Sequence, residues 1–249
     1  MEEHNTPKLI HKQKKWNEYF IEFILVFLAI TMGFFAENIR ENIIDREKEN
    51  EFILSMIEDA ETDIKNIHVA LDLNKKRILN LDTLAYRCNN FGNPGIWEKE
   101  LYRSFFPALR HPDFVSPTER TLMQLKNAGG MSLIRKKPAI DRIIQYDDFS
   151  KKLIDQQTWY EDALTSLLEP STRIFNQKYY PSLKSELPWL PYSHDSLKLI
   201  TTEKLKLIEF GNHVLLYRSI VMFYIIRLEE GEQNAVELIN TLRKEYNVE

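Results

Sequence analysis

The sequence predicts an all-α protein, in which an N-terminal transmembrane helix continues into a long helix and is followed by an extramembrane helical bundle. Three observations predict this class. An apolar run occupies residues 19–36, and apolar residues recur with helical spacing from Ile53 to Ala85. Glycine is scarce, at 7 of 249 residues or about 3%, against roughly 7% in average proteins. We divide the chain into a short basic cytoplasmic tail (1–15), a transmembrane helix (16–38) and a bundle domain (39–249), expected to be periplasmic.

The transmembrane helix is predicted from the run YFIEFILVFLAITMGFFA, Tyr19 to Ala36, in which Glu22 is the only charged side chain. At 1.5 Å per residue, 18 residues span about 27 Å, close to the roughly 30 Å hydrocarbon core of a bilayer. Trp16 and Tyr19 are aromatic residues of the kind found at the headgroup boundary. A buried core helix stays open as an alternative, because the uncharged part is short. A cleaved signal peptide is disfavoured by the long polar leader and by Glu22.

The orientation follows from a small excess of basic residues before the helix. Lys8, Lys12, Lys14 and Lys15 precede it, and Arg40, Arg46 and Lys48 follow it. The positive-inside rule therefore places the N-terminus in the cytoplasm and the bulk of the chain outside a bacterial inner membrane.

One face of this helix is predicted to associate with a second copy of the chain. The face consists of residues spaced by four and three: Glu22, Val26, Ala29, Gly33 and Ala36, with Arg40 beyond them. Ala29 and Gly33 form a small-x-x-x-small pair that lets two backbones approach closely. Glu22 would either extend to the headgroups or share a hydrogen bond between subunits.

Beyond the membrane segment, one long helix is predicted, because no proline occurs between Pro7 and Pro94. Its inward seam is Ile53, Ile57, Ala60, Ile64, Ile67, Leu71, Asn74, Ile78, Leu81 and Ala85, widened by Leu54, Met56 and Leu84. Asn74 would be a tolerated amide on the helix face or a register-setting residue at an oligomer seam.

Turn and cap signals place the remaining elements. Asn89 to Pro94, NNFGNP, is predicted as a loop, followed by a helix from Trp97 to Phe106 that ends before Pro107. Ser116-Pro117-Thr118-Glu119 is a helix start with a serine cap, and Gly129-Gly130 ends that helix.

Two further long helices are predicted. The first runs from about Pro138 to Leu168, with Ile140, Ile143, Ile144, Leu153, Ile154, Ala163 and Leu167 inward. The second runs from Thr202 to about Tyr246, and its stretch Val214 to Leu228 is predicted to be the central core helix, since Arg218 and Arg227 interrupt any membrane span. The connection from Pro170 to Ser196 is proline- and aromatic-rich. Trp97, Trp159 and the rings between Tyr179 and Tyr192 are expected to be buried.

The composition and motifs favour a non-enzymatic protein without cofactor or metal. A formal charge of −4 with no long basic stretch argues against nucleic acid, and the single cysteine, Cys88, excludes an internal disulfide. Nucleotide-binding, nucleophile-elbow and zinc motifs are missing. The best candidates for a ligand cluster or an acid/base pair are His111-Pro112-Asp113 and His194-Asp195. We expect both, however, to be exposed loop residues without such a role.

Two stretches resemble a family of small bacterial membrane proteins classed as a domain of unknown function. They are IEFILVFLAITMGFFAENIRENI, Ile21 to Ile43, and TLMQLKNAGGMSLIRKKPAIDRIIQYDD, Thr121 to Asp148. The chain departs from the family in the threonine and glycine of its membrane segment. The resemblance implies one N-terminal transmembrane helix and a helical remainder, and implies no activity. We therefore expect a membrane-anchored interaction or scaffold component of the cell envelope with an unknown envelope partner, or alternatively an extracytoplasmic sensory or ligand-binding bundle.

Overall fold

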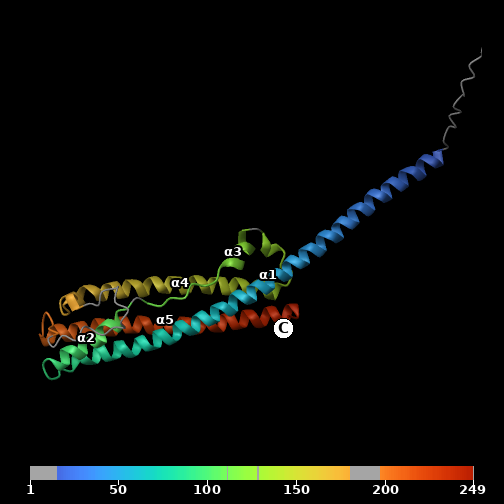
Figure 1. Cartoon of the computed structure of the whole chain (residues 1–249). Helices are drawn as coiled ribbons and strands as arrows, with labels where there is room; N and C mark the ends of the chain where they lie inside the picture. Colours follow the sequence, from blue (N-terminus) through green and yellow to red (C-terminus); the bar gives the residue numbers. More distant parts are fainter. Residues whose placement is uncertain (1–15, 111, 128, 180–196, 249) are drawn as a thin grey trace, which may run out of the picture. The chain divides into compact units, whose positions relative to one another are not determined.

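The structure is a computed structural model that describes residues 16–110, 112–127, 129–179 and 197–248. These residues form helices and connecting loops without a strand, which confirms the all-α prediction (Figure 1). The elements are α1 (Trp16–Asn89), α2 (Ile96–Ala108), α3 (Arg120–Asn127), η1 (Gly130–Ser132), α4 (Lys137–Thr172), η2 (Gln177–Tyr179) and α5 (Lys204–Tyr246). The chain divides into two compact units, Met1–Asn50 and Glu51–Glu249, and the second holds the helical bundle.

Helix α1 confirms the prediction of a single long helix from the membrane segment to the loop at 89–94. It ends at Asn89, where the asparagine side chains complete the last turn. Asn89 Nδ2 donates to the Ala85 carbonyl at 2.9 Å, and Asn90 Nδ2 donates to the Tyr86 carbonyl at 2.8 Å. The backbone amide of Asn90 also donates to the Tyr86 carbonyl, at 2.9 Å, so both asparagines cap the last turn.

The predicted seam of α1 is the face that the bundle buries. All of its members are buried except Ile64, which is half-buried, and Met56 and Leu84 join them. Leu54 was expected to widen the seam, and this was wrong, because it is 45% exposed. The seam packs against α4 and α5, and Figure 1 shows this part of α1 running alongside both helices.

Polar pairs join α1 to α5, which runs antiparallel to it, along the exposed edge of the α1–α5 contact. They recur at seven-residue intervals on α1: Glu61–Arg243 (2.9 Å), His68–Glu232 (2.8 Å), Lys75–Glu229 (3.3 Å) and Asp82–Arg218. A seven-residue interval keeps each partner at the same angle around a pair of packed helices. Such exposed pairs set the register of two helices more than they add stability.

Asn74 lies inside the bundle, so its interpretation as an oligomer seam residue was wrong. Its side chain is fully buried and donates to the Ala70 carbonyl at 2.8 Å and the Asp113 carbonyl at 3.3 Å. Its amide oxygen accepts a hydrogen bond from the Tyr160 hydroxyl at 2.9 Å. The amide therefore joins α1, α4 and the loop before α3 within one chain.

Helix α2 extends slightly further than predicted, through Pro107 to Ala108. Proline is tolerated here because it lies in the last turn, where little of the helix remains to be disrupted. Leu109 N donates to the Phe105 carbonyl at 3.1 Å and closes the helix. The inward rings of α2 include Tyr102, Phe105 and Phe106.

Helix α3 begins at Arg120, so the predicted start with Ser116 as cap was wrong. Instead, two buried carboxylates of α1 bind the backbone around the start of α3. Asp63 accepts the Thr118 amide at 2.9 Å and its hydroxyl at 2.7 Å, and Asp59 accepts the Thr121 amide at 3.1 Å. These acceptors come from another helix, so a local cap signal cannot reveal them. The predicted end of this helix at the glycine pair is confirmed, with Gly129 in the left-handed region at φ 67°.

Helices α4 and α5 confirm the last two predicted helices, with corrections to their inward faces. Ile144 and Ile154 are 45% and 40% exposed, and Trp159 is 68% exposed, so all three were wrongly placed inside. Tyr160, the neighbour of Trp159, takes the inward position and is fully buried. The stretch 214–228 of α5 buries one face and exposes the other, so it is not wholly a core helix. Trp97 is buried as predicted; the rings at 180–192 lie outside the described residues.

Candidate functional site

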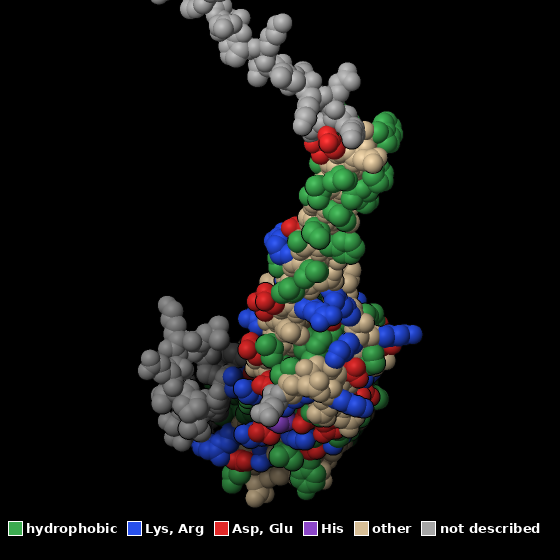
Figure 2. Space-filling model, turned by 90° about the vertical axis from the view of Figure 1, so that its right-hand side faces the viewer, with side chains coloured by type: hydrophobic (Ala, Val, Ile, Leu, Met, Phe, Trp, Pro, Cys, Tyr) green, Lys and Arg blue, Asp and Glu red, His purple; other side chains and the backbone are tan. Residues whose placement is uncertain are grey.

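The predicted membrane segment is helical throughout and exposed on every side within its own unit. Among the described residues, one helix, α1, is long and apolar enough to cross a membrane, and none of its 18-residue apolar window is buried. Within its own unit, the segment is therefore not covered as a core helix would be. On the face that Figure 2 shows, apolar side chains cover this part of α1, whereas charged side chains are spread over the bundle.

The predicted association face, Glu22, Val26, Ala29, Gly33 and Ala36, lies entirely on α1. All five residues are exposed. Apart from the adjoining backbone of α1 itself, a Cβ added at Gly33 would meet no atom of the chain within 4 Å. The face is therefore open to a neighbour, and whether a second copy binds it stays a prediction.

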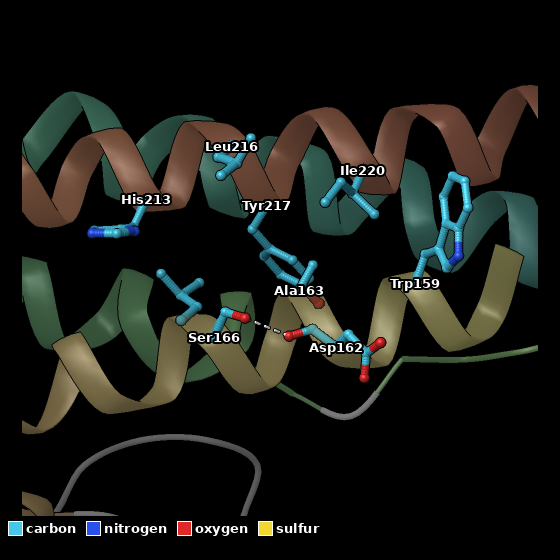
Figure 3. A pocket seen from close by; sticks show the side chains of 9 residues that line it. Trp159, Asp162, Ala163, Ser166, His213, Leu216, Tyr217 and Ile220 are labelled. Carbon is cyan, nitrogen blue, oxygen red and sulfur yellow. Dashed lines mark hydrogen bonds between the residues drawn. The ribbon is translucent and has the colours of Figure 1, made fainter.

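The bundle carries a second candidate, a groove between α4 and α5 that sequence reasoning missed. We call its first part the apolar lobe, a cavity of about 360 Å³. It is lined by Trp159, Asp162, Ala163, Ser166 and Leu167 of α4 and by His213, Leu216, Tyr217 and Ile220 of α5. Figure 3 shows Trp159 and His213 at opposite ends, with Leu216 and Ile220 between them.

A second cavity of about 320 Å³, which we call the polar lobe, continues the groove toward the end of α4. It is lined by Ser166, Glu169, Pro170, Arg173 and Ile174, and by Lys206, Glu209, Phe210 and His213 of α5. Ser166 and His213 line both lobes and therefore mark their junction. The Ser166 hydroxyl donates to the Asp162 carbonyl at 2.8 Å, as Figure 3 shows, so its donor is already used.

The charges of the groove are unevenly compensated. Arg173 pairs with Glu169 one turn away, and Lys206 pairs with Glu203. Within the described residues, the carboxylates of Asp162 and Glu209 have no ion-pair partner. The groove therefore presents unpaired negative charge beside an apolar surface.

A buried aromatic cluster forms the wall of the groove toward α1. The ring of Tyr217 lies 5.5 Å from that of Tyr160, which lies 5.4 Å from that of Tyr224. Burial raises the pKa of all three phenols, so they stay neutral. The Tyr224 hydroxyl accepts the Val115 amide at 3.1 Å, which ties the loop before α3 to this wall. The ring contacts between Tyr160 of α4 and Tyr217 and Tyr224 of α5 hold these two helices together beneath the groove.

The two histidine clusters suggested by the sequence lie partly outside the described residues and stay untested. His111 and His194 lie outside the described residues, whereas His68 pairs with Glu232. In the ranges that the structure describes, no three His, Cys, Asp or Glu side chains could together hold a metal ion. Burial raises the pKa of the Cys88 thiol to about 12, so it is not a nucleophile near neutral pH.

Comparison of the chain with protein-family models, curated proteins and solved structures finds no match. What the groove can do chemically must therefore be argued from its own residues. It combines an apolar lining with a few charged groups, a combination that small-molecule binding sites commonly have.

Proposed function

We propose that the protein is a single-pass membrane protein whose residues 16–38 span a bacterial inner membrane. The observation that carries this proposal is the complete exposure of the apolar window of α1. Apolar side chains exposed on every face of a helix are stable in lipid, whereas in water each would lose about 1.5–3 kcal/mol of burial energy. The four lysines before the helix support a cytoplasmic N-terminus and a periplasmic bundle.

The membrane helix is proposed to pair with that of a second copy through the face that includes Ala29 and Gly33. Apart from the adjoining backbone of α1 itself, no atom of the chain would lie within 4 Å of a Cβ at Gly33, which supports this proposal. Close approach of two backbones at small residues supplies the attraction, and a hydrogen bond from Glu22 would add only about 1 kcal/mol.

For the bundle, we propose a non-enzymatic interaction or scaffold role within the cell envelope. Large apolar side chains exposed on α1 are the surface that we propose for contact with a partner. They are Val69, Leu79 and Tyr86, with exposed fractions of 61–66%. The bundle core is complete without them.

The scaffold role is tested by cross-linking in living cells. A photoreactive amino acid at Tyr86 is expected to give a discrete adduct with an envelope protein, whereas the same amino acid at Lys152, an exposed position of α4, serves as control. Equal adducts from both positions, or none from Tyr86, would contradict a role for this α1 surface.

The α4–α5 groove favours the second function, a ligand-binding bundle. A cavity of about 360 Å³ with apolar lining and a few polar groups falls within the roughly 300–1,000 Å³ of small-molecule pockets.

A further inference from the structure

We propose that the α4–α5 groove binds a small amphiphilic cation, that is, an apolar or aromatic molecule that carries one protonated amine. The proposal rests on the ligand-binding function above and names the class of ligand. Three features of the groove carry it: the shape and lining of the apolar lobe, the unpaired carboxylates, and the exposed indole of Trp159.

The apolar lobe provides the surface for the body of the ligand. Ala163 of α4 lies across it from Leu216 and Ile220 of α5 (Figure 3), and Leu167 of α4 also lines it. Leu216 is 64% exposed although it lines a concave surface, so a ligand would remove much of its apolar area from water.

The charges of the groove select a positive group. Asp162 lines the apolar lobe and Glu209 lines the polar lobe, and neither has an ion-pair partner among the described residues. The cations nearby, Arg173 and Lys206, are each paired with a glutamate. Two carboxylates without ion-pair partners would repel an anionic amphiphile and attract a cationic one.

Trp159 supplies a second means of binding a cation. Its side chain is 68% exposed and stands at one end of the apolar lobe, three residues before Asp162 on α4. An indole face attracts an ammonium group, and a nearby carboxylate strengthens that attraction. A tryptophan with this exposure contributes little to the core, so its ring is free for a ligand.

The test measures binding of three matched probes to the full chain in nanodiscs of phosphatidylcholine, a lipid without net charge. Phenylbutylamine, phenylbutanol and phenylbutyrate share one apolar body and differ in the charge of the end group. The chain carries fluorotryptophan, and the fluorine NMR signal of Trp159, assigned by its loss in Trp159→Phe, reports binding at the groove. The amine is expected to bind about tenfold more tightly than the alcohol, and the carboxylate most weakly.

Variants on α4 locate the selectivity. Asp162→Asn is expected to remove most of the preference for the amine and leave the affinity for the alcohol unchanged. The control Glu161→Gln changes an adjacent exposed carboxylate that does not line the groove, and should behave like the wild type.

The outcomes separate the ligand class from the ligand-binding function. Equal affinity for the three probes, or a preference that survives Asp162→Asn, would overturn the cation assignment and keep the groove as a binding site. No shift of the Trp159 signal with any probe would overturn both.

Discussion

Removing the Tyr160 hydroxyl is expected to destabilise the bundle by about 1–3 kcal/mol, because it leaves the Asn74 amide oxygen buried without its donor. The hydroxyl donates to that oxygen at 2.9 Å, and both side chains are fully buried. Tyr160→Phe keeps the ring and its packing against Tyr217 and Tyr224, so the cost reports the hydrogen bond and not a cavity. A domain of this size should lose about 2–4 °C in melting temperature per kcal/mol.

The assay is urea unfolding of the full chain in micelles, followed by far-ultraviolet circular dichroism. A double-mutant cycle with Asn74→Leu isolates the interaction, since the second substitution removes the acceptor. The double variant is expected to cost less than the two single variants added together, by about 1 kcal/mol. An unchanged free energy of unfolding for Tyr160→Phe, or additive costs, would show that this amide does not depend on the phenol.

Three further predictions concern other parts of the chain. Burial raises the pKa of Asp63 above 3.8, so the stability that this carboxyl contributes is present at low pH and is lost as the pH rises through the raised pKa. The stability of the wild type minus that of Asp63→Asn, measured by urea unfolding at several pH values, should therefore fall over that range; a difference that is constant or rises would contradict it. Trp159→Ala should change the free energy of unfolding by about 0.5 kcal/mol or less, as is usual for exposed positions, and a large drop in melting temperature would place the ring in the core. Gly33→Ile should weaken dimers in a membrane association assay more than Val26→Ile, and wild-type association of Gly33→Ile would remove this face as an interface.

Much of the fold follows from local patterns in the sequence. The four-and-three spacing from Ile53 to Ala85 predicts the buried face of α1, because a helix brings such residues onto one side. The asparagines and glycine at 89–92 predict its end, and the glycine pair at 129–130 predicts the end of α3. Each signal acts within a few residues of the structure that it determines.

The errors occur where distant residues decide the outcome. The start of α3 depends on Asp59 and Asp63, more than fifty residues earlier in the chain. Trp159 and Tyr160 are adjacent large rings, and helical periodicity leaves open which of them faces inward. Tyr160 does so because Asn74 of α1 accepts its hydroxyl, whereas the indole of Trp159 has no such acceptor there.

Of the two candidate sites, one can be predicted from local sequence and the other cannot. The exposed membrane helix is predictable from composition, because an apolar run of this length is itself the signal. The groove is not, since it depends on the separation between the outer faces of α4 and α5. The groove is lined by residues 159, 163 and 166 of α4 and 213, 216 and 220 of α5. These residues have the spacing of any helix face, so the sequence does not indicate a gap between the two helices there.

Labelling of single cysteines in intact cells tests the central proposal, a spanning helix with the bundle outside, most directly. Cys88 is fully buried, and its raised pKa of about 12 keeps it as a thiol, so it adds little background. Thr165→Cys, at an exposed position of α4, is expected to react with a membrane-impermeant maleimide in cells with a permeable outer membrane. Asn5→Cys is expected to react only after the inner membrane is opened. Reaction of both cysteines under the same condition would contradict a spanning helix, and the reverse order would overturn the orientation.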